Sequence, residues 1–323
     1  MIISRTPLRV SFCGGGTDLD GFAVDEPEGG RVVSIAIDRY VYVTLNQRFD
    51  DGIRVSYSSI ENVDSVDEIQ HGLVREAMRM TGIESGVEVT TIADIPGRGT
   101  GLGSSSSLTV GLLNAMHALQ GRKPSKDQLA EEACSIEIDV LGAPIGRQDQ
   151  YAAAFGGANS IRFKSSGVSV EPINLMEGIS DEISKKFSLV YTGITRSASE
   201  ILGDGSEHTH ERNSRLREIR DHADKAAIMM GEGDLESLGL LLNDAWLSKR
   251  ETSSRVSTSE IDELYDKVMS IGAKGAKLLG AGSGGFFLVY GGTGLRESLS
   301  KELGPENRIL PVGIDFSGSE VIF

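Results

Sequence analysis

Cysteine, tryptophan and positive charge are scarce in this sequence of 323 residues. Only Cys13 and Cys134 are present, which excludes a disulfide framework and a metal site built on Cys spacing. The single tryptophan, Trp246, is expected to pack in a core rather than to stack on a ligand. Lys and Arg number 32 against 47 Asp and Glu, a formal net charge of −15. Because a binder of phosphate backbones needs a basic face, we expect no nucleic-acid partner.

Long apolar runs are also lacking. No stretch approaches the roughly 20 apolar residues that cross a bilayer, and "MIISRTPLRVSF" shows neither an apolar core nor a cleavage-site pattern. The hydrophobic fraction of 39% is that of a globular protein, and the length allows one or two domains. We therefore expect a cytoplasmic protein with reduced thiols and no membrane partner.

Several common catalytic signatures are absent. No Gly-Lys-Ser/Thr occurs, which excludes a Walker A loop, and neither the dinucleotide fingerprint nor the His-Arg-Asp of protein kinases is found. A hydrolase that uses a serine of the run 104–107 is disfavoured because no Gly-x-Ser-x-Gly turn is present. Function must therefore be sought in another kind of loop.

Glycine, by contrast, is abundant and clustered, with 40 residues in the chain. In "PGRGTGLGSSSS", Gly97, Gly99, Gly101 and Gly103 alternate before a serine run and an apolar helix. Glycine allows positive φ and close backbone approach, and a helix N-terminus offers unpaired N–H groups. The stretch predicts an anion-binding loop; the alternative is a flexible loop capped by serine.

Hydrophobic periodicity places this loop between a strand and a helix. Alternating segments predict strands at 2–12, 31–49, 52–58, 87–95, 158–173, 187–192, 286–290 and 308–315. Helical spacing predicts helices at 67–82, 104–119, 126–141, 209–231, 233–250, 258–272 and 295–303. Helices and hairpins do not alternate strictly, so the fold class is α+β. Apolar periodicity fades near 175–186, which predicts a boundary between domains 1–185 and 186–323.

Three ordered motifs carry a resemblance to a known family. The loop Pro96, Gly101, Leu102, Gly103, Ser104 and Ser105 matches the pattern Pro-x3-Gly-Leu-Gly-Ser-Ser, which resembles the phosphate loop of the GHMP kinases. "TPLRVSFCGGGTDLDGF" resembles the substrate-side motif of that family, and "KLLGAGSGGFFLVY" resembles its third, glycine-rich motif. The variant "SFCGGGTD" resembles the branch of sugar 1-kinases.

The resemblance implies a fold and a reaction. It implies a ribosomal-protein-S5-like N-terminal domain that binds ATP, a ferredoxin-like C-terminal domain, and a cleft between them. The implied reaction transfers the γ-phosphoryl group of ATP, with Mg²⁺, to the anomeric hydroxyl of a sugar or sugar phosphate. D-glycero-D-manno-heptose 7-phosphate is the expected acceptor, and a homodimer is possible in this family.

Nucleotide and metal residues follow from the same match. The nucleotide-binding set is expected in the glycine loop and the helix after it: Pro96, Gly97, Gly99, Gly101, Leu102, Gly103, Ser104, Ser105 and Ser106. The Ser105 hydroxyl and a carboxylate are suitable ligands for a hard cation that keeps several waters. The family places that carboxylate about where Glu137 stands; the alternative for Glu137 is a solvated helix-face acid.

Catalytic and substrate residues complete the set. Asp149 resembles the catalytic aspartate of galactokinase, which accepts or orients the proton of the sugar hydroxyl, and Arg9 would lie beside it. An ordinary turn aspartate and an edge-strand arginine are the alternatives. The substrate set is Gly15, Gly16, Thr17 and Asp18 of the first motif, Gly282 of the third motif, and Arg196, which follows the strand at 187–192. The alternative for Asp18 is a loop cap after Gly16. Arg196, Arg147 and Arg98 could each read a second phosphate, and each is equally an ordinary surface arginine.

Two rival functions stay open at this point. One is another sugar 1-kinase, for L-fucose or an unphosphorylated heptose or hexose. The other is a catalytically silent regulator that binds nucleotide or sugar. The presence of Arg9, Ser105, Glu137 and Asp149 argues against a silent protein.

Overall fold

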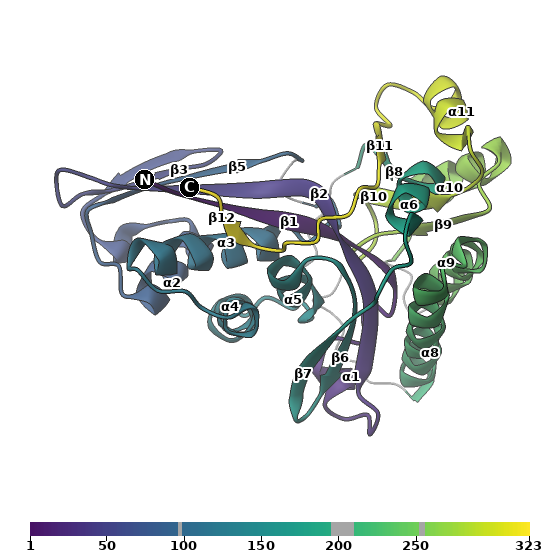
Figure 1. Cartoon of the computed structure of the whole chain (residues 1–323), viewed down its shortest axis with the longest axis horizontal. Helices are drawn as coiled ribbons and strands as arrows, with labels where there is room; N and C mark the ends of the chain where they lie inside the picture. Colours follow the sequence, from purple (N-terminus) through teal and green to yellow (C-terminus); the bar gives the residue numbers. More distant parts are fainter. Residues whose placement is uncertain (96–98, 195–209, 252–255) are drawn as a thin grey trace.

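Two β-sheets, one in each half of the molecule, organise the fold (Figure 1). The computed structural model describes residues 1–95, 99–194, 210–251 and 256–323. The first sheet follows the order β12-β1-β2-β5-β3-β4, with β6 paired to β2 and β7 paired to β6. Its strands are β1 (Ile2–Cys13), β2 (Gly30–Gln47), β3 (Ile53–Ser56), β4 (Ile60–Val63), β5 (Val87–Ala93), β6 (Ala158–Lys164), β7 (Gly167–Pro172) and β12 (Glu320–Val321).

The long antiparallel pair β1 and β2 forms the frame of the first sheet. Its register runs from Ile2 opposite Leu45 to Cys13 opposite Val33, with irregularities after Pro7 and Ser11. β2 is long enough to pair with β5 along its second half and with β6 along its first half. One strand pair, β3 with β5, is parallel.

Helices cover one face of this sheet (Figure 1). They are α2 (Gly72–Thr81), α3 (Ser104–Leu119), α4 (Lys126–Cys134) and α5 (Gln148–Phe155). α3 is buried along most of its length because its sequence is apolar or small on nearly every side. Short helices lie at α1 (Asp20–Ala23) and η1 (Val66–Glu68).

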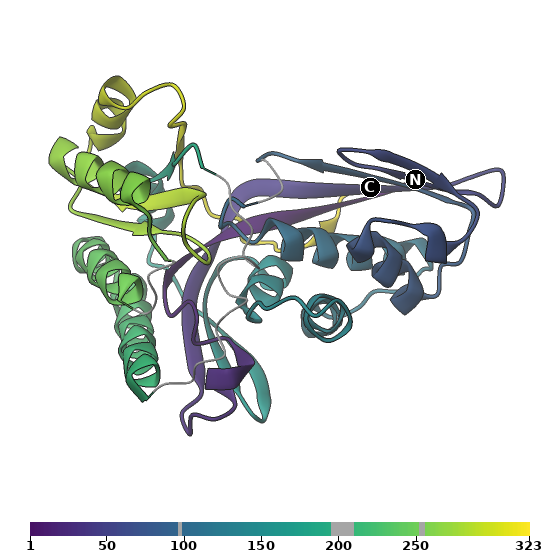
Figure 2. The same ribbon diagram turned by 180° about the vertical axis from the view of Figure 1, so that it is seen from behind.

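The second sheet has the order β11-β8-β10-β9 and is antiparallel throughout. Its strands are β8 (Phe187–Tyr191), β9 (Gly275–Leu278), β10 (Phe286–Tyr290) and β11 (Ile309–Pro311). The helices around it are α6 (Ile179–Lys186), α8 (His210–Glu232), α9 (Leu235–Arg250), α10 (Ser259–Ile271) and α11 (Leu295–Glu302). α8 and α9 pack against each other, as both views show (Figures 1 and 2).

The two halves share a continuous apolar core. Leu8, Val10 and Phe12 of β1 lie in one cluster with Leu189 of β8 and Leu288 of β10. Residues that alternate with these on the second sheet face another cluster, built with α10 and α11. Because β1 contributes to the joint core, residues of β1 are fixed relative to both halves.

Several described elements lie outside the predicted helices and strands, among them the short α1, β4 and the helix α5. Residues 179–186, assigned to a boundary without periodicity, form α6, and residues 275–278 form β9. β12 was also not predicted, and it brings the end of the chain back to pair with β1. The boundary at 185 stays a prediction, although β12 belongs to the first sheet.

The helix predicted over 126–141 changes character half-way. α4 ends at Cys134, and Ser135–Val140 continues as a π-helical turn in which Leu141 N–H bonds to the carbonyl of Ile136. Such turns are frequent at functional sites. Here the turn carries Glu137, which is only 2% exposed, so Glu137 is not a solvated helix-face acid.

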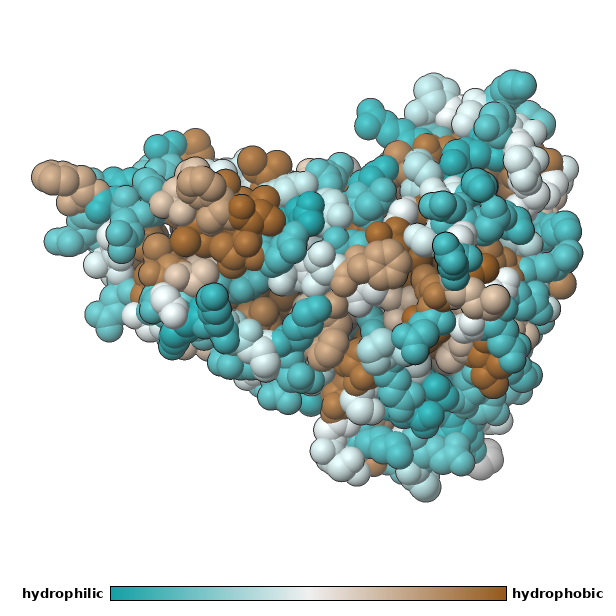
Figure 3. Space-filling view, viewed as in Figure 1, coloured by the Kyte–Doolittle hydropathy of each residue, from teal (hydrophilic) through white to brown (hydrophobic). Residues whose placement is uncertain are grey.

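The cysteines, the helices and the exposed apolar side chains can be compared with the features expected from the composition. Cys13 and Cys134 are free and buried. Within the described ranges, no helix is both long and apolar enough to cross a membrane. Figure 3 shows apolar surface close to the two termini, where exposed large side chains include Met1, Ile322 and Phe323. The cytoplasmic location and the homodimer stay predictions.

Candidate active site

The described part of the glycine loop leads directly into α3. Gly99, Gly101 and Gly103 all have positive φ, and Gly103, at +75°, is the N-cap of α3. A β-carbon on Gly103 would lie 3.2 Å from Asp149 Oδ2 and 3.3 Å from Arg9 Cγ. Only glycine therefore gives this turn together with such close contact to two side chains. The free N–H groups of α3 begin at this point, as an anion cradle requires.

The third motif packs on the glycine loop. A β-carbon on Gly101 would lie 2.5 Å from the carbonyl oxygen of Leu279, and one on Gly285 would lie 2.3 Å from that of Thr100. Phe286 also donates its backbone N–H to Thr100 at 3.2 Å. The loop between β9 and β10 thus fixes the shape of the phosphate loop from the second half of the molecule.

Arg9 and Asp149 form a paired, two-point contact. Nε of Arg9 donates to Asp149 Oδ1 and Nη2 donates to Asp149 Oδ2, both at 2.7 Å, and Nη1 donates to the carbonyl of Gly101 at 2.5 Å. Arg9 is 4% exposed and Asp149 keeps 21% of its side chain exposed. A carboxylate oxygen can accept more than one hydrogen bond, so Asp149 still has capacity for a hydroxyl proton. Arg9 and Asp149 thus lie side by side, as the resemblance implied, and next to the glycine loop; their catalytic roles stay predictions.

The Glu137 side chain reaches the start of α3 from the π-helical turn Ser135–Val140. Its Oε1 accepts a hydrogen bond from Ser105 Oγ, and its Oε2 accepts one from Gln150 Nε2 at 2.7 Å. Burial raises the pKa of Glu137, while hydrogen bonds from Ser105, Ser106 and Gln150 act in the opposite direction. The carboxylate has no ion pair with a side-chain cation in the described part of the chain. A buried carboxylate next to a serine hydroxyl is a suitable donor set for a hard cation.

The substrate-side loop surrounds Asp18, which is almost fully buried at 1% exposure. Asp18 Oδ1 accepts the backbone N–H of Gly16 at 2.9 Å, and Oδ2 accepts the backbone N–H and the side-chain Nε2 of Gln148. Burial and the charge of Asp149 raise the pKa of Asp18. The Thr17 hydroxyl is also buried and donates to the carbonyl of Gly14 at 2.8 Å. Asp18 and Thr17 therefore shape the loop, which leaves Gly15 and Gly16 at its partly exposed surface.

Two lysines at the centre of the molecule were missed by the sequence analysis. Lys277 of β9 is 3% exposed and donates to the carbonyl of Ser11 at 2.6 Å. Lys249, at the end of α9, donates to the carbonyl of Gly280. Burial lowers the pKa of Lys277 to about 7, with contributions from Lys249 and Arg9, and lowers that of Lys249 to about 8. One signal was available: Lys277 is the first residue of the third motif and stands in an otherwise apolar segment.

The remaining predicted residues fall into two groups. Pro96, Gly97, Arg98 and Arg196 lie outside the described residues. Gly282 lies within the described residues. A β-carbon there would lie 2.5 Å from the carbonyl oxygen of Val256, so Gly282 packs against the backbone of Val256. Arg147 forms a half-exposed ion pair with Asp20. Trp246 is fully buried, as expected.

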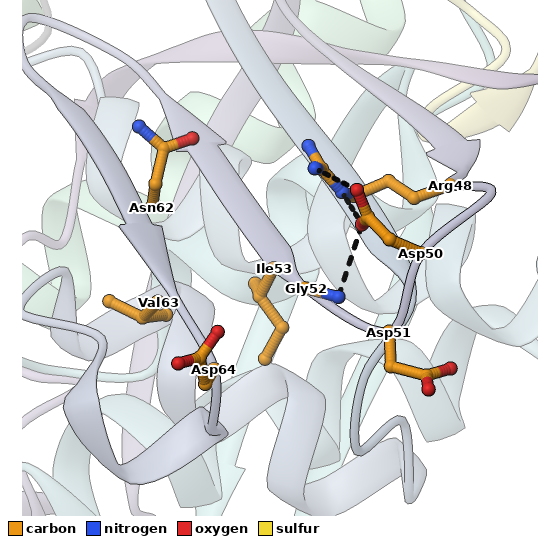
Figure 4. A pocket seen from close by; sticks show the side chains of 8 residues that line it. All are labelled: Arg48, Asp50, Asp51, Gly52, Ile53, Asn62, Val63 and Asp64. Atoms are coloured by element: carbon orange, nitrogen blue, oxygen red, sulfur yellow. Dashed lines mark hydrogen bonds and ion pairs between the residues drawn. The ribbon is translucent and has the colours of Figure 1, made fainter.

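A surface hollow elsewhere does not compete for the nucleotide. It has a volume of about 500 Å³ and lies around the turn from β2 to β3 and the end of β4 (Figure 4). Its lining includes Asp50, Asp51 and Asp64, and Asp50 is paired with Arg48. None of the motif residues lines it, and its acidic lining repels phosphate.

Comparison with known proteins agrees with this geometry. The model of the GHMP kinases N terminal domain matches residues 69–157, and that of the GHMP kinases C terminal matches residues 225–294. A D-glycero-alpha-D-manno-heptose 7-phosphate kinase of Campylobacter jejuni is 31% identical over 312 residues, which cover 90% of this chain and 89% of the relative. A galactokinase of Thermococcus kodakarensis is 26% identical, covering 92% of this chain and 91% of the relative.

Solved structures show the same fold. The crystal structure of a D-glycero-D-manno-heptose 1-phosphate kinase from Bacteriodes thetaiotaomicron superposes with a TM-score of 0.81 at 22% identity, over 99% of this chain and 98% of the other. The chain belongs to the GHMP kinase family, and the two-domain α+β fold implied by its motifs is confirmed. It is an ATP-dependent phosphotransferase whose acceptor is an alcohol group.

Proposed function

We propose that this enzyme transfers the γ-phosphoryl group of ATP to the anomeric hydroxyl of D-glycero-D-manno-heptose 7-phosphate and forms the 1,7-bisphosphate. The observation that carries the reaction is the Arg9–Asp149 pair in contact with Gly103 at the phosphate loop. The relative from Campylobacter jejuni, a heptose 7-phosphate kinase, supports the choice of acceptor.

The chain's own residues perform positioning and charge stabilisation, which dominate phosphoryl transfer. N–H groups at Gly103 and the start of α3 bind the phosphates. Asp149 accepts or orients the proton of the acceptor hydroxyl, a contribution of about 10²–10⁴-fold for a general base. Arg9 holds the Asp149 carboxylate at two points and adds positive charge where the phosphoryl group passes.

Ser105 and Glu137 are the residues that would hold Mg²⁺. Their fit rests on a carboxylate 2% exposed that accepts hydrogen bonds from neutral donors. In the described ranges no group of three or more His, Cys, Asp or Glu side chains could hold a metal alone. This suits Mg²⁺, which usually takes few protein ligands and shares the remainder with water and substrate phosphates. Bound there, the ion would neutralise charge on the transferred phosphates.

A second candidate acceptor is an unphosphorylated sugar. Galactokinases and the kinase region of fucokinases match nearly the whole chain at 23–28% identity. Among the three arginines considered for a second phosphate, Arg147 is already paired with Asp20. The choice between the two acceptors therefore requires an assay.

The test is ADP release with Mg-ATP against heptose 7-phosphate, free heptoses, L-fucose, galactose and mevalonate. Asp149→Asn removes the charge at the same size, and Asp127→Asn, on the exposed side of α4, is the matched control. We expect turnover confined to heptose 7-phosphate and lost by about 10²–10⁴-fold in Asp149→Asn alone. Turnover confined to an unphosphorylated sugar would discard the acceptor, and ATP binding without turnover on any acceptor would favour a silent regulator.

A further inference from the structure

The side chain of Gln148 joins the catalytic aspartate to the substrate-side loop. Gln148 is the first residue of α5 and directly precedes Asp149. Its Nε2 donates to Asp18 Oδ2 at 2.9 Å, and its backbone N–H donates to the same oxygen at 3.2 Å. A β-carbon on Gly15 would lie 3.7 Å from this Nε2, so the carboxamide borders the glycine turn of the loop.

The orientation of the carboxamide is fixed by its partner. Asp18 Oδ2 already accepts the backbone N–H of Gln148, and Asp18 Oδ1 accepts that of Gly16. An oxygen that accepts hydrogen bonds requires the amide nitrogen, not the amide oxygen, to face it. The Asp18 carboxylate therefore points the Oε1 of Gln148 away from itself.

That oxygen has no partner among the described residues. Gln148 Oε1 is buried, and no donor in the described part of the chain makes a hydrogen bond to it. A buried acceptor without a donor is unfavourable, and such groups in folded proteins usually have a partner from water or a ligand. Asp18 holds the amide in the orientation that leaves Oε1 without a donor. This points to a donor on a bound ligand.

The position of Asp149 indicates what that donor is. The reacting hydroxyl must come within hydrogen-bond reach of Asp149, the next residue in the helix. Asp149 borders Gly103 on the phosphate side, whereas Gln148 borders Gly15 on the substrate side. A polyol bound between them presents its other hydroxyls toward the substrate-side loop.

We propose that Gln148 is an acceptor-binding residue: its Oε1 accepts a hydrogen bond from an acceptor hydroxyl that does not receive the phosphoryl group. Asp18 orients the Gln148 amide and in this respect acts as a positioning residue. The proposal rests on the proposed function only in that the acceptor is a sugar. It explains how this site favours a polyol, because an acceptor without that hydroxyl leaves Oε1 unpaired.

The test combines side-chain and substrate deletion. The acceptor that the wild-type enzyme turns over best is compared with its monodeoxy analogues, in the wild type, in Gln148→Ala and in the volume-conserving Gln148→Met. Gln128→Ala, exposed on α4, is the matched control. We expect both Gln148 variants to raise the acceptor KM by about 10-fold or more while the KM for ATP stays unchanged.

One monodeoxy analogue should identify the bonded hydroxyl. In the wild type it should show the same loss of kcat/KM as the variants show with the full sugar, and in the variants it should cause no further loss. The assignment of Gln148 is overturned if every analogue lowers kcat/KM by the same factor in the variants as in the wild type. It is also overturned if the variants change the KM for ATP as much as the KM for the acceptor. Either result leaves the proposed function intact. A wild-type enzyme that turns over no sugar would instead overturn both.

Discussion

The buried lysine of β9 gives a prediction that can be worked through in free energy. Lys277 is 3% exposed, and burial lowers its pKa from 10.5 to about 7. At about 1.4 kcal/mol per pKa unit, this shift in pKa means that folding disfavours the charged form of Lys277 relative to the neutral form by roughly 5 kcal/mol. Substitution by methionine matches the unbranched stem of lysine up to Cε and removes the titrating amino group.

The sign follows from proton counting. Between pH 7 and 10.5 the unfolded chain holds the Lys277 proton and the folded chain has released it. The unfolded state therefore binds more protons, and stability rises with pH across this window by up to about 1.4 kcal/mol per unit from this group. Below pH 7 Lys277 is charged in both states, and the burial of its charge lowers the free energy of unfolding by the full amount. In Lys277→Met this contribution to the pH dependence disappears.

The assay is urea unfolding at pH 6.5, 7.5, 8.5 and 9.5, with Lys267→Met on the exposed side of α10 as the control. We expect the free energy of unfolding of Lys277→Met, minus that of the wild type, to fall as the pH rises. The slope is the readout, because removing the ammonium also leaves the carbonyl of Ser11 without this donor. Parallel stability curves for the wild type and Lys277→Met would refute the reasoning.

Three further predictions follow from the site. Gly101→Ala should raise the KM for ATP and lower stability by about 1–3 kcal/mol, because its β-carbon would lie 2.5 Å from the carbonyl oxygen of Leu279 at a φ of +74°; kinetics and urea unfolding measure this. Glu137→Gln should raise the Mg²⁺ concentration needed for half-maximal rate, measured by Mg²⁺ titration at saturating ATP. Arg147→Ala should change the free energy of unfolding by less than about 1 kcal/mol, because its ion pair is half-exposed.

Control variants and contradicting results can be named for these three predictions. Gly121→Ala also changes a glycine at positive φ, but no atom lies within 4 Å of its β-carbon, so the KM for ATP should stay unchanged. Glu132→Gln, on α4 just before the π-helical turn that carries Glu137, should leave the Mg²⁺ requirement as it is. An unchanged Mg²⁺ titration in Glu137→Gln would remove Glu137 from the metal site. A loss of several kcal/mol in Arg147→Ala would show that its ion pair is not an ordinary surface pair.

Much of the molecule could be predicted because the information is local in the chain. Alternation predicted the long strands β1, β2 and β5, and helical spacing predicted α3, since both patterns arise from one face of an element being buried. The alternating glycines before α3 indicated positive φ, which Gly99, Gly101 and Gly103 have. These features depend on neighbouring residues, and the sequence displays them directly.

Other features depended on contacts between distant residues. The Arg9–Asp149 pair joins residues 140 positions apart, and its placement was implied by resemblance rather than by any pattern around Arg9. The amide of Gln148 is aimed by Asp18, 130 positions away. β12 exists only because β1 offers it an edge.

The sequence by itself determined the family, the order of the motifs and the chemistry of the phosphate loop. Only the tertiary structure decided which charged and polar groups are buried together. It places Lys277 against Ser11, Glu137 against Ser105 and Gln150, and Asp18 against Gln148. The physical reason is that backbone preference is set by neighbours along the chain, whereas burial and charge pairing are set by the segments that folding brings to the same place.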